Sequence, residues 1–413
     1  MSDRSSYYSS VFSGLLNQSC TQLFFVCLLG PYWATTAFGQ QAIHENRSSP
    51  ILPLEINWTV DLGQTTVQTP AYNASAVFVS LPSGSLRSVS LSDGTNLWDV
   101  LQPTDQAPVA DDSIVIVSQA NELLGLKPAD GTIVWKTDVG FPVTAPVLLC
   151  NGWLIASLSN GELAVIRAYD GQELWRRQLN GSFSVTPAIS AERLYVPIDE
   201  GRVVALQLRT GAVIWEQDFV GSPGEMLVLD AVFLGSTDNF LYRLSLDDGT
   251  IDWKWRTGGD IAGRPRVDER NIYFLSLDNS FRALDRQSGV QQWRVALPWR
   301  PIPGLSILNS TLVVSGISTE IRFFSAVSGE NLGIYSAPAE LRGKAHIVAG
   351  FPSSRTRIVI LSDDGIVTGL KPGTGPKLQA LAFPFPILLP LPRLLELSSR
   401  TLIDTESQLP QSP

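Results

Sequence analysis

Apolar and polar residues alternate in short runs along most of this chain. The segment after position 184 contains four such runs, SVTPAI, RLYVPI, RVVALQL and AVIWEQDF, separated by Ala191-Glu192, Glu200-Gly201 and Thr210-Gly211. Short runs rich in branched and aromatic residues, interrupted by Gly or Asp turns, are typical of strands joined in hairpins. No sustained helical period occurs here, so the pattern predicts four antiparallel strands within one unit.

This unit is repeated along the chain, and seven tryptophans mark the repeats. They are separated by 40, 37, 40, 40, 38 and 40 residues. In all but the first repeat a turn glycine stands four residues before the tryptophan, as in Asp130-Gly131 before Trp135. A period of about forty residues is typical of one four-stranded propeller blade. The seven are Trp58, Trp98, Trp135, Trp175, Trp215, Trp253 and Trp293.

Two degenerate copies complete the count. The turn returns as Ser328-Gly329, but Gly333 replaces the tryptophan, and another weak copy lies at 371–375. Terminal repeats are expected to be atypical because they have different neighbours. The intervals from Trp58 onward therefore predict an all-β, eight-bladed β-propeller with four-stranded antiparallel blades.

Ring closure is expected to involve the N-terminal strand of the repeat region. An open ring would leave a blade with unpaired edge groups. The segment Pro53 to Asp61 contains Trp58 but has no turn phrase before it. We predict that it pairs into the last blade, beside strands near 347–350, 358–361 and 366–370; residues 377–385 are the alternative outer strand.

The repeated residues have a structural explanation. An indole between adjacent blades buries a large apolar area and bonds its N–H to a backbone carbonyl, whereas a ligand cage requires tryptophans to converge. Regular recurrence favours packing. The aspartates before glycine (Asp93, Asp130, Asp170 and Asp248) are interpreted as turn caps.

The phrase Asp-Gly-x-x-x-Trp, preceded by strands such as 203–206 and 281–285, resembles the pyrroloquinoline-quinone-type propeller repeat. That family includes quinoprotein alcohol dehydrogenases and the outer-membrane assembly lipoprotein BamB. The resemblance covers about residues 51–380 and implies eight blades. The resemblance implies the fold, whereas the function depends on the residues of the site, because propellers host unrelated activities.

Composition and the chain ends point to an exported acidic protein. Net charge is −9, which disfavours nucleic acid as a partner. An apolar stretch at 23–30, too short to span a membrane, precedes Ala37-Phe38-Gly39 and is typical of a signal peptide. Neither Cys20 nor Cys27 has the lipobox that the BamB resemblance implies. The expected domains are a leader at 1–39, a linker at 40–50, the propeller at 51–382 and a proline-rich tail at 383–413.

Catalytic signatures are scarce. The chain has two histidines, His44 and His346, and no usual zinc spacing or Gly-x-Ser-x-Gly elbow. It also lacks the adjacent cysteines and the long insertions that the dehydrogenase resemblance implies. We therefore expect no enzyme activity, metal or cofactor. A quinone-dependent oxidoreductase relative and a sensor propeller that binds a small ligand or glycan in its funnel are the alternatives.

The loops between blades suggest where a partner binds. The early loops are neutral or acidic, whereas the late ones contain basic and aromatic residues. Arginine and tryptophan are enriched at interface hot spots. We predict a partner-binding rim, unless these cations pair with Asp260, Asp268 and Glu269. The expected protein is a monomeric periplasmic scaffold that binds protein partners, including the outer-membrane barrel assembly machinery. The rim residues are Arg256, Arg264, Arg266, Trp299, Arg300, Arg342 and Lys344.

Overall fold

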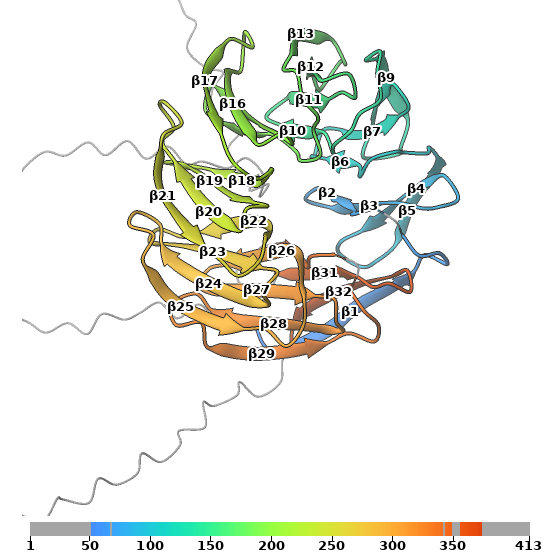
Figure 1. Ribbon diagram of the computed structural model, residues 1–413. Helices are drawn as coiled ribbons and strands as arrows, with labels where there is room; N and C mark the ends of the chain where they lie inside the picture. Colours follow the sequence, from blue (N-terminus) through green and yellow to red (C-terminus); the bar gives the residue numbers. More distant parts are fainter. Residues whose placement is uncertain (1–50, 67, 342, 349–355, 374–413) are drawn as a thin grey trace, which may run out of the picture. The chain divides into compact units, whose positions relative to one another are not determined.

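The computed structural model describes residues 51–66, 68–341, 343–348 and 356–373 (Figure 1). All of them belong to one compact unit that ends at Gly373. Their strands, β1 to β32, form eight four-stranded sheets in which every neighbouring pair is antiparallel. The eight sheets are the blades of a propeller, which confirms the predicted fold.

The first four blades follow one another along the chain. Blade 1 consists of β2 (Ala71–Tyr72), β3 (Ala76–Ser80), β4 (Ser85–Ser90) and β5 (Asn96–Leu101). Blade 2 consists of β6 (Val109–Ala110), β7 (Val115–Gln119), β8 (Glu122–Leu126) and β9 (Ile133–Asp138). Blade 3 consists of β10 (Leu148–Cys150), β11 (Trp153–Ser157), β12 (Glu162–Arg167) and β13 (Glu173–Gln178). Blade 4 consists of β14 (Ala188–Ser190), β15 (Arg193–Ile198), β16 (Arg202–Gln207) and β17 (Val213–Asp218).

The remaining blades continue the same order, except that the last borrows the first strand. Blade 5 consists of β18 (Pro223–Val228), β19 (Val232–Ser236), β20 (Phe240–Leu244) and β21 (Ile251–Arg256). Blade 6 consists of β22 (Ile261–Val267), β23 (Asn271–Ser276), β24 (Ser280–Asp285) and β25 (Gln291–Ala296). Blade 7 consists of β26 (Pro301–Leu308), β27 (Thr311–Gly316), β28 (Glu320–Ser325) and β29 (Asn331–Ser336). Blade 8 consists of β30 (His346–Val348), β31 (Arg357–Leu361), β32 (Ile366–Pro372) and β1 (Leu54–Asp61).

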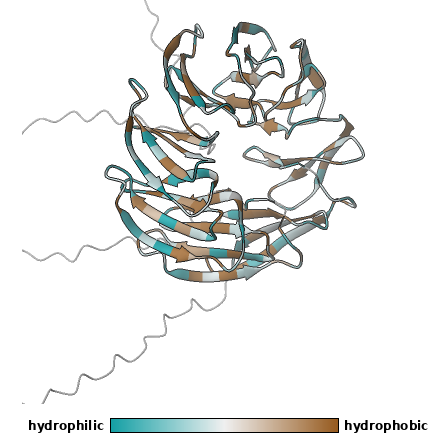
Figure 2. Ribbon diagram, viewed as in Figure 1, coloured by the Kyte–Doolittle hydropathy of each residue, from teal (hydrophilic) through white to brown (hydrophobic). Residues whose placement is uncertain are grey.

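The core lies between neighbouring blades. The two middle strands of each blade are almost continuously buried, as in Val77, Phe78 and Val79 of β3, because both of their faces meet another blade. One apolar cluster joins Ile155 of blade 3 to Val196 of blade 4. The outermost strands alternate between buried and exposed residues and show mixed hydropathy in Figure 2.

Ring closure follows the predicted route. β1 pairs antiparallel with β32, with Trp58 opposite Gly369. A Cβ on Gly369 would come within 2.2 Å of the Trp58 indole, so this position requires glycine. Trp58 in turn donates its Nε1–H to the carbonyl oxygen of Leu91 in blade 1, at 3.1 Å. The N-terminal strand thus joins the last blade to the first.

Each repeat tryptophan contacts the next blade. Its Nε1 donates to a backbone carbonyl in the turn between the third and fourth strands of that blade, at 2.8–3.2 Å in all seven cases. The indoles therefore pack between blades, as predicted, and do not converge. Where Gly333 replaces the tryptophan, Leu52 fills the space: a Cβ on Gly333 would lie 2.4 Å from its Cδ1.

The turn aspartates have the predicted structural role. The Oδ1 atoms of Asp93, Asp130, Asp170 and Asp248 each accept a hydrogen bond from the backbone N–H two residues later, at 2.9–3.2 Å. This is the Asx-turn geometry that supports a tight reversal. The glycine that follows each of these aspartates has a positive φ, between 71° and 76°.

Several predicted segments lie outside the described residues. They are the leader, the linker, the proline-rich tail and the alternative outer strand at 377–385. In the part of the chain that the structure describes, there is no helix long and apolar enough to cross a bilayer.

Candidate functional site

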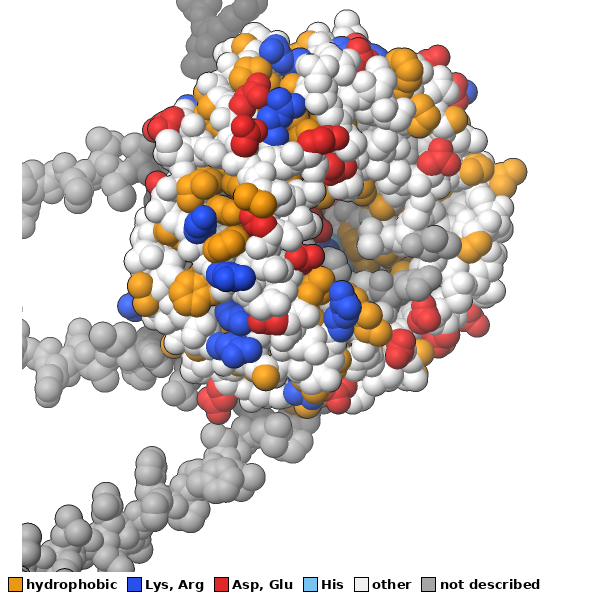
Figure 3. All heavy atoms as spheres, in the orientation of Figure 1, with side chains coloured by type: hydrophobic (Ala, Val, Ile, Leu, Met, Phe, Trp, Pro, Cys, Tyr) orange, Lys and Arg blue, Asp and Glu red, His pale blue; other side chains and the backbone are white. Residues whose placement is uncertain are grey.

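The eight inner strands surround a cavity of about 460 Å³ at the centre of the ring. Figure 3 shows that one face of the ring is hollowed at this point. Every blade contributes to the lining, from its inner strand or from the residues just before it. This cavity, here called the central channel, has a volume typical of small-molecule sites.

The structure brings three of the predicted rim residues together inside the channel. Arg264 and Arg266 belong to β22, and Lys344 lies two residues before β30. β22 and β30 flank β26, whose Gly304 allows a close approach: a Cβ there would fall 2.1 Å from the Cβ of Lys344. The late blades therefore form a cationic arc of the channel wall.

The other predicted rim residues lie elsewhere. Arg256 is the last residue of β21 and Arg300 lies in the connection between β25 and β26; both side chains are exposed. Trp299 is half-buried, and its indole covers Gly316, where a Cβ would come within 2.1 Å. Arg342 lies outside the described residues. The predicted rim is thus divided between an outer edge and the channel wall.

The cations of the channel do not form the ion pairs considered from the sequence. Over residues 51–373, apart from the undescribed gaps, no ion pair of 4 Å or less joins Arg264, Arg266 or Lys344 to an acidic side chain. The Nε of Arg264 is buried without a hydrogen-bond acceptor in the described structure. The Nε of Arg266 donates to the carbonyl of Leu305 at 3.0 Å, which holds the guanidinium beside β26.

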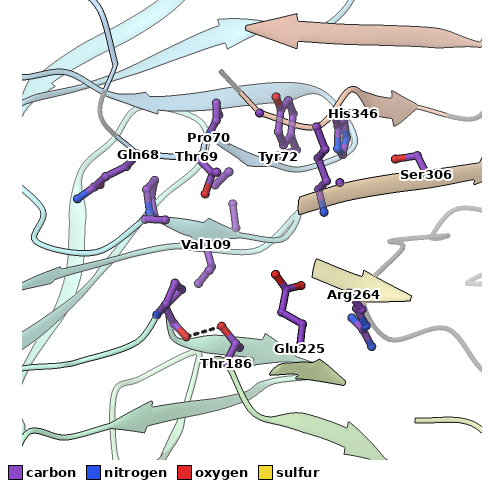
Figure 4. Close-up of a pocket in the computed structure, with 18 of the residues that line it drawn as sticks. Gln68, Thr69, Pro70, Tyr72, Val109, Thr186, Glu225, Arg264, Ser306 and His346 are labelled. Carbon is purple, nitrogen blue, oxygen red and sulfur yellow. Dashed lines mark hydrogen bonds between the residues drawn. The ribbon is translucent and has the colours of Figure 1, made fainter. Parts of the chain in front are cut away.

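One carboxylate, Glu225 of β18, faces the same space, and Figure 4 shows it near Arg264. Burial lowers the pKa of Arg264, and the charge of Glu225 partly opposes this effect. Burial and the neighbouring Arg264 lower the pKa of Arg266 to about 10. Lys344 is reached by the water of the channel, yet the surrounding protein and the two arginines lower its pKa to about 8. At neutral pH all three groups are charged, and they outnumber the carboxylate.

An aromatic pair lies next to this arc. The rings of Tyr72 and His346 stack with centroids 3.6 Å apart and an interplanar angle of 4° (Figure 4). Burial and the charge of Lys344 lower the pKa of His346 to about 3, so the imidazole is neutral at physiological pH. His346 therefore adds a flat polar surface to the channel and no charge.

The wall contributed by the early blades is largely apolar. Its lining residues come from short segments before and within β2, β6 and β10. The hydroxyl of Thr186 is already used, because it donates to the carbonyl of Pro146 at 3.0 Å (Figure 4). The channel is thus two-sided. Its apolar arc consists of Pro70, Ala71, Ala107, Pro108, Val109, Pro146 and Val147.

The sequence contains a signal for this division that the loop-by-loop interpretation missed. The inner-strand segments align as TPAY (69–72), APVA (107–110), APVL (145–148) and TPAI (186–189), followed by RPRV (264–267), GLSI (304–307) and KAHI (344–347). Where the early blades have threonine or small apolar residues at the first and third positions, blade 6 has Arg264 and Arg266, and blade 8 has Lys344 and His346. Because alternate strand residues share a face, those positions point the same way.

Groups of acidic, histidine and cysteine side chains that could hold a metal ion are absent from the described residues. His346, the histidine of the described residues, stacks on Tyr72, and no hydrogen bond is recorded between its imidazole and a side-chain hydroxyl there. The functional groups that the structure does assemble are cations, one carboxylate and an aromatic surface.

Comparison with known proteins relates most of the propeller to one family. The chain is 28% identical over 194 residues to the outer membrane protein assembly factor BamB of Alkalilimnicola ehrlichii, a match that spans 43% of this chain and 50% of that protein. It is 24% identical over 326 residues to the protein of the same name from Yersinia pestis, covering 68% of this chain and 81% of the relative.

A solved structure agrees at the level of the fold. BamB from Moraxella catarrhalis superposes with a TM-score of 0.59 at 16% sequence identity, over 77% of this chain and all of that chain. The family model described as outer membrane protein assembly factor BamB matches residues 82–230 and 226–383, which is most of the propeller. The chain therefore belongs to the outer membrane protein assembly factor BamB family.

Proposed function

We propose that this protein is an exported, non-enzymatic scaffold that assists the assembly of outer-membrane β-barrel proteins by binding a protein partner. The observation that carries the proposal is the family match along the propeller, whose relatives are named as outer membrane protein assembly factors. The signal-like leader at 1–39 supports a location in the periplasm, where such a factor would act.

The face that carries the connections between blades is the candidate partner surface. In a four-stranded antiparallel blade, these connections lie at the same end as the turns between the second and third strands. Exposed large apolar side chains occur at this end in several blades. Apolar side chains and arginines on one surface are typical of protein–protein interfaces. They are Leu101, Phe141, Val220 and Ile317, which are 80%, 43%, 96% and 54% exposed.

Arg256 and Arg300 project from the same end. The strand pairing places Arg256 opposite Phe240, and the N–H of Ile317 donates to the carbonyl of Arg300 at 3.1 Å. Neither guanidinium forms an ion pair with another described residue. We infer that these arginines and the exposed apolar side chains contact the partner, and that the protein acts as a monomer.

Deletion of the gene in its own host tests the proposal. Loss of the protein is expected to lower the amount of folded outer-membrane barrels, measured by their heat-modifiable mobility on gels. Re-expression of the full chain should restore it. A photo-crosslinking residue at Val220 should capture a component of the barrel assembly machinery, whereas one at Asp247, an exposed residue at the opposite end of a blade, should not. Normal barrel levels in the deletion strain would refute the proposed role.

A further inference from the structure

We propose that the central channel is a binding site for a small organic anion, a carboxylate with an apolar or aromatic body, held by Arg264, Arg266 and Lys344. This site is separate from the exposed partner surface and does not depend on the proposed role in assembly.

The first argument is the uncompensated charge. Three cations line one cavity with a single carboxylate, Glu225, and none of the three forms an ion pair within the described chain. Several poorly exposed arginines elsewhere in the described propeller form ion pairs, as Arg282 does with Asp278 at 2.8 Å. Charges that are partly withdrawn from water and unpaired are costly, and such an arrangement is typical of sites that receive a charged ligand.

The second argument is orientation. Arg266 is held by its Nε contact with the carbonyl of Leu305, and the Cα and Cβ of Lys344 lie close to Gly304 of β26. Arg264 has a buried Nε without an acceptor. A carboxylate matches the fork of an arginine guanidinium, and a hydrogen bond between charged groups is stronger than a neutral one.

The third argument is the opposite wall. The apolar arc of blades 1 to 3 carries no ionisable group other than Tyr72, which stacks on His346. A bare inorganic anion would leave this arc in contact with water only. A ligand with a carboxylate at one end and an apolar or aromatic body at the other would cover both arcs, within about 460 Å³.

Calorimetric titration of the full chain tests the proposal with four probes. Benzoate and octanoate supply a carboxylate on an aromatic and an aliphatic body. Benzamide is the neutral analogue of benzoate, and sulfate is an anion without a body. We expect the two carboxylates to bind, with benzamide and sulfate at least about tenfold weaker, because each lacks one of the two matched features. Equal binding of benzamide, equal binding of sulfate, or no carboxylate binding at millimolar concentration would overturn the proposal.

Substitutions locate the binding. Arg264→Gln and Lys344→Gln should each weaken benzoate binding by about tenfold or more, since each removes a charged donor. Lys254→Gln and Arg294→Gln, on the exposed faces of β21 and β25, are matched controls that should bind as the unmodified chain does. Thr69→Trp, which narrows the channel and keeps the cations, should also abolish binding. A cooperative thermal unfolding transition in each variant would show that the variant is folded, so that a loss of benzoate binding can be assigned to the channel. Benzoate binding that survives both channel substitutions would refute the site.

Discussion

Trp135 of blade 2 donates its indole Nε1–H to the carbonyl oxygen of Ala168 in blade 3, at 2.9 Å. The same indole covers Gly171, three residues further on, where a Cβ would lie 2.5 Å from its Cε3 atom. Within one repeated phrase, the glycine therefore contacts the tryptophan of the preceding blade, whereas the tryptophan contacts the following blade. Each tryptophan packs on the glycine turn of the following blade, and the repeat couples consecutive blades around the ring.

This relationship predicts a specific cost for a methyl group at Gly171. Gly171→Ala must adopt a φ near +72° and also displace Trp135 and Thr137. Gly152→Ala is the matched control, because its φ is +80° but nothing lies within 4 Å of the added Cβ. We expect the control to lose about 1–2 kcal/mol of unfolding free energy, from backbone strain alone. Gly171→Ala should lose about 1–3 kcal/mol more. Equal losses in urea denaturation would show that the indole contact is unimportant.

The fold could be predicted from the sequence because one blade-length unit is repeated along the chain. Six copies of one turn phrase predicted the blade length, and the edge-pairing argument predicted that residues 53–61 join the last blade, as β1 does. The funnel was considered as a ligand site, but the residues that line it were not predicted, because they come from eight separate blades. Arg264 and Lys344 were assigned to a partner-binding rim formed by the loops between blades. In the structure, Arg264 lies on β22 and Lys344 two residues before β30, where both line the channel. The stacking of Tyr72 on His346, far apart in the sequence, follows only from ring closure.

Closure of the ring by β1 predicts that this strand can be supplied separately. A chain that begins at residue 63 lacks β1, so β32 would have an unpaired edge and blade 1 would lose the contact from Trp58. We expect this chain to melt at a lower temperature and to aggregate. A peptide of residues 51–62 should restore the melting temperature. The same peptide with Trp58→Ala is the control and should not, because it cannot fill the space over Gly369. Unchanged melting of the truncated chain would contradict this role of β1.

A third prediction concerns the ion pair between Asp278 and Arg282, whose side chains are 16% and 8% exposed. Burial by itself would raise the pKa of Asp278, but hydrogen bonds from Arg282, Ser280 and Ser276 outweigh it and hold the pKa well below its ordinary value. The carboxylate therefore contributes stability above pH 3.8, which is lost as the pH falls below that value.

Asp278→Asn leaves Arg282 buried without its counter-charge, which is expected to cost about 3 kcal/mol of unfolding free energy at pH 7. Glu192→Gln is the control, because its pair with Arg209 is 63% and 67% exposed, so its loss should cost much less than the loss of the Asp278 pair. Chemical denaturation at pH 7 measures both. Similar costs for the two substitutions would mean that burial does not strengthen the Asp278 pair.

The channel predicts an unusual dependence of stability on alkaline pH. The pKa of Lys344 is lowered from 10.5 to about 8 by the protein that surrounds this part of the channel, with Arg266 and Arg264 contributing and Glu225 opposing. Between these two pH values the unfolded chain binds more protons at Lys344 than the folded chain does, so this group makes stability rise from pH 8 to about 10.5. Below pH 8 its charge is a constant cost. The groups that face it are Arg264, Arg266, Glu225, Tyr72 and His346.

Lys344→Gln removes this dependence and should be more stable than the unmodified chain at pH 7, with the difference shrinking by pH 10.5. Because tyrosines also titrate in this range, the useful quantity is the difference in unfolding free energy between the two proteins at each pH. Lys254→Gln, on the exposed side of β21, is the control and should show no such trend. A constant difference between pH 7 and 10.5 would contradict the lowered pKa.

The last prediction separates the outer edge of the propeller from its channel. Arg256→Glu with Arg300→Glu reverses two exposed charges that form no ion pair with a described residue, so the melting temperature should change little. If these arginines contact an acidic surface of the partner, reversal should weaken capture by about tenfold or more, through slower association and faster dissociation. Arg209→Glu, exposed at the opposite end of a blade, is the matched charge control and should leave capture unchanged. Benzoate binding in the channel should also be unaffected. Loss of capture in the control would indicate a general charge effect, and unchanged capture in the double variant would exclude Arg256 and Arg300 from the interface.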